Sequence, residues 1–131
     1  MPSPLDRIAK ALGLRRCCPP PPAVRGLNAA PGGGSGEVIV TWPPLPAPAG
    51  VRFYRVYRRK AAGLWSLLAI VTDETLGLLA PGRLGVVDTP DGWPWPSGAD
   101  PEAERCYAVS AVSTNGLEGP MSAVACAIPT S

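Results

Sequence analysis

Short apolar runs separated by turn-forming residues fill the chain from Ala23 onward. Most of these runs are rich in β-branched or aromatic residues, and the segment 51–60 alternates between apolar and polar positions. The runs cover residues 37–42, 51–60, 64–72, 84–89, 105–113 and 121–128. Proline- and glycine-rich segments lie between them, and the last two runs flank a hairpin-like loop with Asn115–Gly116. The pattern predicts an all-β sandwich built from several short strands.

In the N-terminal segment the apolar residues recur with the period of a helix. Leu5, Ile8, Ala9 and Leu12 share one helical face, which predicts a short helix over residues 4–12. A helix this short is marginal alone, so we expect its apolar stripe to pack against another surface. The following "CCPPPP", residues 17–22, reads as a polyproline II spacer, with a docking peptide for an aromatic groove as the alternative. We therefore expect an arm over residues 1–22 and a β-domain over residues 23–129.

Several motifs of the β-domain occur in an order that resembles a fibronectin type III domain of the bacterial or phage kind. They are "GEVIVTWPP", "YRVYR", "VVDT" and "CYAVSAVSTNGLEGPMS". The resemblance covers residues 20–129 and implies an immunoglobulin-like, seven-stranded β-sandwich. It places a tryptophan, Trp42, in the second strand and tyrosines in the third and sixth strands, Tyr54 and Tyr107. The chain contains no RGD tripeptide, so the integrin-binding use of the family finds no support.

Large side chains at alternating strand positions are expected to fill the space between the two sheets. The predicted core residues are Trp42, Tyr54, Val56, Tyr107 and Val109.

The segment between Asp88 and Tyr107 is longer than the family pattern and contains the motif "GWPWPSG". Prolines stiffen this motif, so Trp93 and Trp95 are presented at low entropic cost. Three interpretations stay open: a lid over the end of the sandwich, a protein-contact patch, or a sugar-binding surface. The lid is the first choice and the contact patch is the second.

The charge of the chain is distributed unevenly. Ten of the twelve basic residues lie in residues 1–60, and eight of the ten acidic residues follow them. Strand alternation divides the basic run of residues 52–60 between two faces, and the end of the run is expected to approach Glu102 and Glu104. Cross-strand charge pairs then explain the run, and we do not expect nucleic-acid binding.

Four cysteines form two groups, the adjacent Cys17–Cys18 and the pair Cys106 and Cys126. The last two predicted strands place Cys106 and Cys126 almost opposite each other, which permits a disulfide but leaves two buried thiols as an alternative. The spacing does not fit the usual zinc motifs, so no metal site is expected.

The chain has no histidine, which removes the commonest general acid–base group and a classical catalytic triad. We expect no enzyme activity and no cofactor. The first functional hypothesis is a structural or interaction module that its arm anchors to a larger assembly, such as a phage virion decoration or tail protein or a surface appendage. In this hypothesis Leu5, Ile8, Leu12, Trp93 and Trp95 contact the protein partner.

The alternative is an accessory module that binds carbohydrate or peptide through Trp93 and Trp95. Attachment to a membrane through "RRCC" is a third, unspecific interpretation.

The N-terminus does not fit a secretory signal, because Asp6, Arg7 and Lys10 interrupt its apolar part. No run is long enough to span a membrane. We expect synthesis in the cytoplasm, without export by the general route, and possible incorporation into a virion or surface assembly.

Overall fold

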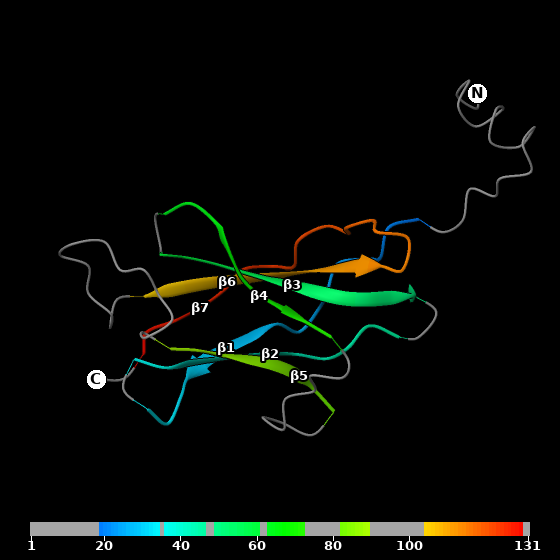
Figure 1. Cartoon of the computed structure of the whole chain (residues 1–131). Helices are drawn as coiled ribbons and strands as arrows, with labels where there is room; N and C mark the ends of the chain where they lie inside the picture. The colour runs from blue at the N-terminus through cyan, green and yellow to red at the C-terminus, as the bar shows by residue number, and fades with distance from the viewer. Residues whose placement is uncertain are drawn as a thin grey trace, which may run out of the picture.

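Two antiparallel sheets face each other in the computed structural model of the chain (Figure 1). The structure describes residues 19–34, 36–46, 49–60, 63–72, 82–89 and 104–129. The first sheet has the order β1-β2-β5, with β1 at Asn28–Pro31, β2 at Val38–Trp42 and β5 at Leu84–Asp88. The second has the order β4-β3-β6-β7, with β3 at Val51–Lys60, β4 at Ser66–Val71, β6 at Arg105–Ser113 and β7 at Ala125–Ala127. The predicted β-sandwich is confirmed at the level of an all-β fold with two antiparallel sheets.

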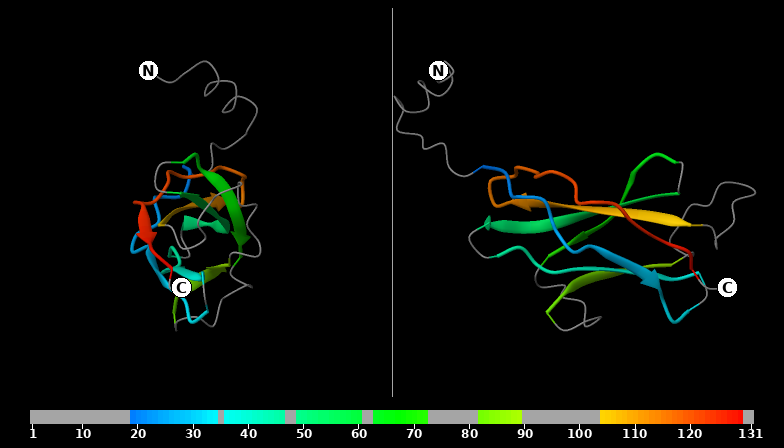
Figure 2. Two further views of the ribbon diagram at one scale, coloured as in Figure 1. Left: turned by 90° about the vertical axis from the view of Figure 1, so that its left-hand side faces the viewer. Right: turned by 180° about the vertical axis from the view of Figure 1, so that it is seen from behind.

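Alternation along the strands determines which side chains enter the space between the sheets. In β2, Val38, Val40 and Trp42 are buried, and in β3, Tyr54 and Val56 are buried between less buried neighbours. Successive strand residues point to opposite faces, so these positions form the inner layer of each sheet. The two views in Figure 2 show the sheets as two facing layers, with β4 along one side.

Aromatic and aliphatic side chains from both sheets form the core. The rings of Trp42 on β2 and Tyr54 on β3 lie 5.6 Å apart between centroids and are tilted by 57°. The Tyr54 hydroxyl accepts a hydrogen bond of 2.8 Å from the backbone N–H of Leu45. Tyr54 therefore fills the core with its ring and still satisfies its polar end.

One of the two inner strands of the second sheet is β6, and all nine of its residues are buried. It pairs with β3 on one side and with β7 on the other. After the turn at Asn115–Gly116, where Gly116 has a φ of 81°, the chain returns beside β6. The N–H of Gly119 donates to the Ala111 carbonyl, and that of Ser122 donates to the Val109 carbonyl, both at 2.8 Å. The returning chain thus covers part of β6 in addition to its two strand partners.

Candidate interaction surfaces

The residues that the sequence singles out for partner binding lie outside the described part of the chain. This holds for Leu5, Ile8 and Leu12 of the predicted helix, and for Trp93 and Trp95 of the long loop. Their assignment stays a prediction, as does the choice between lid, contact patch and sugar site.

The structure does place the residues that the sequence assigns to the core. Trp42, Tyr54, Val56, Tyr107 and Val109 are each at most 1% exposed. All five belong to one apolar cluster between the sheets.

The side of the second sheet that points away from the first is the outer face. On β3 it carries Phe53, Arg55, Tyr57 and Arg59, because the alternate residues Tyr54, Val56 and Arg58 are buried. The basic run is thus divided between two faces, as the alternation predicts. The arginines on the two faces have different partners.

A hydrogen-bonded cluster around Glu118 occupies one part of the outer face. Its carboxylate accepts hydrogen bonds from Ser110 Oγ at 2.5 Å, from Tyr57 OH at 2.7 Å and from Arg55 Nη1 at 3.0 Å. These bonds, led by the one from Ser110, hold the pKa of Glu118 below its usual value, and desolvation opposes them. Desolvation and the bond to Glu118 raise the pKa of the Tyr57 hydroxyl. The cluster fixes an aromatic and a basic side chain in place on the surface.

Apolar groups continue the outer face toward the sheet edge. The guanidinium of Arg59 lies 4.5 Å from the centre of the Trp65 ring, a cation–π geometry. On the edge strand β4, Leu67 is 51% exposed and Ile70 is 54% exposed. The register of β4 against β3 shifts between Val56 and Tyr57. In a regular strand, residues three apart point to opposite faces. The irregular strand β4 instead exposes both Leu67 and Ile70.

A second polar cluster is buried between the two sheets and centres on Asp88 of β5. Its carboxylate accepts hydrogen bonds from Arg58 Nη1 and Tyr107 OH, both at 2.6 Å, and from Arg105 Nη1 at 3.1 Å. Arg105 also donates to the carbonyl oxygen of Gly36. All three donors belong to the second sheet, so the cluster links the two layers.

Sequence reasoning missed this cluster, since it assigned charge partners only to the end of the basic run, which it expected to approach Glu102 and Glu104. In the structure, Arg58 pairs with Asp88 and Arg55 pairs with Glu118. The only signal in the sequence that could have indicated this cluster was a charged residue, Asp88, directly after the run "LGVV". Glu102 lies outside the described residues, and Glu104 is exposed at the start of β6.

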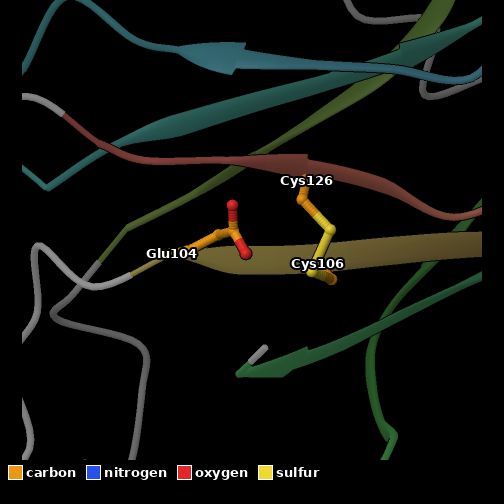
Figure 3. A group of neighbouring side chains, drawn as sticks. All are labelled: Glu104, Cys106 and Cys126. Atoms are coloured by element: carbon orange, nitrogen blue, oxygen red, sulfur yellow. A yellow bond between two sulfur atoms is a disulfide. The ribbon is translucent and has the colours of Figure 1, made fainter. Parts of the chain in front are cut away.

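Cys106 on β6 and Cys126 on β7 stand directly opposite each other and are joined by a disulfide (Figure 3). A carboxylate oxygen of Glu104 and the two sulfur atoms lie within 4.8 Å of one another. This spacing would suit a metal ion if the cysteines were thiolates, but disulfide sulfurs do not offer that donor set. The geometry therefore argues for a covalent link between strands and not for a metal centre.

The last prolines of the "CCPPPP" motif pack against the sandwich. Pro21 is buried, and a side-chain carbon placed at Gly119 would collide with its carbonyl oxygen. Figure 2 shows this segment running beside the chain that follows β6. A groove of about 470 Å³ lies here, lined by Pro19–Pro22, Pro46, Ala49, Gly50 and Ser113–Asn115. Part of the predicted spacer is thus held at a defined place on the domain.

These arrangements indicate a surface for contacts more clearly than a site for a chemical reaction. The carboxylates of Asp88 and Glu118 are each engaged by three protein donors. What the described surface presents outward is a set of aromatic, aliphatic and basic groups on the outer face. No helix in the described part is long and apolar enough to cross a membrane.

No family model matches the sequence, and no curated protein matches it. Sixteen chains of solved structures match the fold. One is a pectate lyase from Pectobacterium carotovorum, with a TM-score of 0.50 and 16% identity over 76% of this chain and 26% of that chain. Another is a β-1,2-glucanase from Parabacteroides distasonis, with a TM-score of 0.52 and 18% identity over 84% of this chain and 14% of that chain. At such identities the likeness shows the fold alone, and it spans only a minor part of each enzyme.

Proposed function

We propose that this chain is a non-catalytic interaction module of the fibronectin type III kind, attached to a larger assembly through its N-terminal arm. The observation that carries the proposal is the burial of Pro21 against Gly119. This contact fixes where the arm leaves the sandwich. An arm with a fixed origin can present its apolar helical stripe to a partner with less loss of conformational entropy than a free tail.

The assignment to the fibronectin type III kind rests on the motifs and on their places in the fold. Trp42 lies on the second strand, Tyr54 on the third and Tyr107 on the sixth, which are the positions that the resemblance implies. The division of seven described strands into sheets of three and four supports the same assignment.

The assembly itself is inferred from the combination of arm and module. A rigid sandwich with a docked proline segment suits a decoration or tail protein of a virion, or a subunit of a surface appendage. This step is an analogy from architecture, since sandwiches of this kind host many functions.

The test compares the full chain with a version that lacks residues 1–18. This deletion keeps Pro19 to Pro22, including the buried Pro21, and so should leave the sandwich intact. Native mass and capture of partners from the source organism are measured for both versions. We expect assembly or partner capture by the full chain only.

A matched variant separates the helical stripe from the rest of the arm. Leu5→Ser, Ile8→Ser and Leu12→Ser keep the arm's length and remove its apolar face. Loss of capture in this variant supports the proposal. Identical monomers without partners for all three proteins contradict it.

A second candidate function is carbohydrate or peptide binding through Trp93 and Trp95. The observation that favours it is that the fold of this chain matches part of two larger proteins, a pectate lyase and a β-1,2-glucanase. Binding to pectate and β-1,2-glucan is tested by calorimetry with the full chain and with Trp93→Ala plus Trp95→Ala. Binding that both substitutions abolish, at unchanged thermal stability, would favour this function over the first.

A further inference from the structure

The two residues of the Cys106–Cys126 disulfide differ in their exposure to solvent. Cys126 is exposed on the short strand β7, whereas Cys106 is 3% exposed on the central strand β6. Thiol–disulfide exchange requires a thiolate to approach one sulfur in line with the bond, so access decides which sulfur is attacked. The Cys126 side of the bond is therefore the side open to an external thiol.

The basic residue that neighbours the bond in the sheet register directs its charge elsewhere. Arg59 of β3 is the direct cross-strand neighbour of Cys106, on the same outer face. Its guanidinium lies over the ring of Trp65, which precedes β4 on the other side of β3 from β6. The charge of Arg59 is therefore directed away from Cys106.

Glu104 opposes the opening of the bond. Its carboxylate lies beside both sulfurs (Figure 3), where its negative charge repels an approaching thiolate. Among the described residues, Glu104 is thus the charged group that the structure places at the disulfide.

The fold can tolerate the opening of this bond. The disulfide lies on the outer face, away from the apolar cluster between the sheets. The chain before β7 remains attached to β6 by the backbone bonds from Gly119 and Ser122. The three-residue strand β7 is the element whose position depends most on the bond.

We propose that the Cys106–Cys126 disulfide is a thiol-exchange site that takes a low-molecular-weight thiol at Cys126. The thiolate sulfur forms a bond to Cys126 Sγ, the bond between the two cysteine sulfurs breaks, and its electron pair leaves on Cys106 Sγ. The Cys106 thiolate then takes a proton from water. A second thiol that attacks the mixed disulfide releases Cys126 as a thiol and leaves the external thiol oxidised, so two thiols are consumed for one disulfide.

The experiment uses the full chain with Cys17→Ser and Cys18→Ser, so that glutathione is the only other source of thiol. The folded protein is incubated with millimolar glutathione, free thiols are trapped by alkylation, and the peptides are mapped by mass spectrometry. We expect glutathione on Cys126 and the alkyl group on Cys106. An adduct on Cys106, or an intact disulfide under conditions in which the urea-unfolded chain reacts, overturns the proposal.

A charge variant tests the proposed neighbour. Glu104→Gln should accelerate the exchange by roughly two- to fivefold. Glu118→Gln, which removes the same charge elsewhere on the second sheet, is the matched control and should leave the rate unchanged. Equal acceleration by the Glu104 and Glu118 variants would contradict the role of Glu104.

A further pair of variants keeps the proposal testable if a charge variant unfolds. Cys106→Ser leaves Cys126 as a single thiol, and Cys126→Ser leaves Cys106. Iodoacetamide should alkylate Cys126 in the first protein at least several-fold faster than Cys106 in the second. The reverse order would overturn the assignment of the attacked sulfur.

Discussion

The hydroxyl of Tyr107 donates a hydrogen bond of 2.6 Å to the carboxylate of Asp88, across the space between the two sheets. Tyr107 is fully buried and Asp88 is 1% exposed. Arg58 and Arg105 approach the same carboxylate. The layers are thus joined by directional polar contacts in addition to apolar packing. Such contacts fix one relative position of the sheets more strictly than apolar packing alone.

Replacing Asp88 by asparagine should destabilise the fold strongly. The amide keeps the size of the side chain but removes the negative charge that Arg58 and Arg105 face. Removing one partner from a buried ion pair typically costs about 3–5 kcal/mol, because charge remains buried without compensation. Urea unfolding of Asp88→Asn measures the loss, and Glu104→Gln controls for the loss of an exposed carboxylate. A difference below about 1 kcal/mol from wild type would contradict this account.

Tyr107 should make the protein sensitive to alkali. Burial, followed by the bond to Asp88, raises the pKa of its hydroxyl above the usual value of 10.0. Above pH 10 the unfolded chain therefore loses this proton while the folded chain keeps it, and stability falls as the pH rises. The slope from one such group is about 1.4 kcal/mol per pH unit. Urea midpoints between pH 9 and 11 measure this slope.

The variant Tyr107→Phe should be less stable than wild type at pH 7 and should lose most of the alkaline slope. Tyr57→Phe is the comparison: the pKa of Tyr57 is also raised, but its hydroxyl lies on the outer face and bonds to Glu118, so this variant should lose only a small part of the slope. An unchanged alkaline slope in Tyr107→Phe would show that other groups cause it.

The sequence predicted most strands because their signal is local. The run 51–60 coincides with β3, and the run 105–113 coincides with β6. The turn at Asn115–Gly116 placed Cys106 opposite Cys126 to within one residue, and the observed register pairs them directly. Local pattern and turn position were sufficient for these features.

The Asp88 cluster could not be predicted in this way. Asp88 meets Arg58 and Arg105 only because the two sheets stack, and this contact depends on the tertiary structure. The contact of Pro21 with Gly119 has the same origin, since the two segments are far apart in sequence. Neither residue carries a local signal of its partner. The helix and tryptophan-loop predictions fall on residues that the structure does not describe.

Replacing Gly119 by alanine should detach the proline segment from the sandwich. The new methyl group would collide with the carbonyl oxygen of Pro21, which is backbone and cannot rotate away. Overpacking of this kind typically costs about 1–3 kcal/mol. The expected result is a lower free energy of unfolding and faster amide exchange at the residues after Pro22. Gly33→Ala is the control, because nothing lies within 4 Å of its new carbon, and it should match wild type.

Glu118 should give the protein a small sensitivity to acid. Its pKa is lowered, so the cluster contributes stability above pH 4.5 that is lost as the pH falls through the folded-state pKa. The side chain is 33% exposed, and screening by solvent limits the effect to less than about 1 kcal/mol. Unfolding of Glu118→Gln at pH 7 and pH 3 should show a smaller difference between the two pH values than wild type. A larger difference in the variant would contradict the assignment.

The edge strand β4 should govern self-association of the concentrated protein. It is an edge of the second sheet, its described residues carry no charge, and Leu67 and Ile70 are about half exposed. Uncharged apolar edges are templates for pairing with other chains, and lysine is the usual protection. Leu67→Lys with Ile70→Lys should therefore reduce aggregation on heating, measured by light scattering, and should change the free energy of unfolding by less than about 0.5 kcal/mol. Val124→Lys with Ile128→Lys, at exposed apolar residues on either side of β7, is the matched control and should aggregate like wild type, whereas equal protection by both variants would show that added charge alone is responsible.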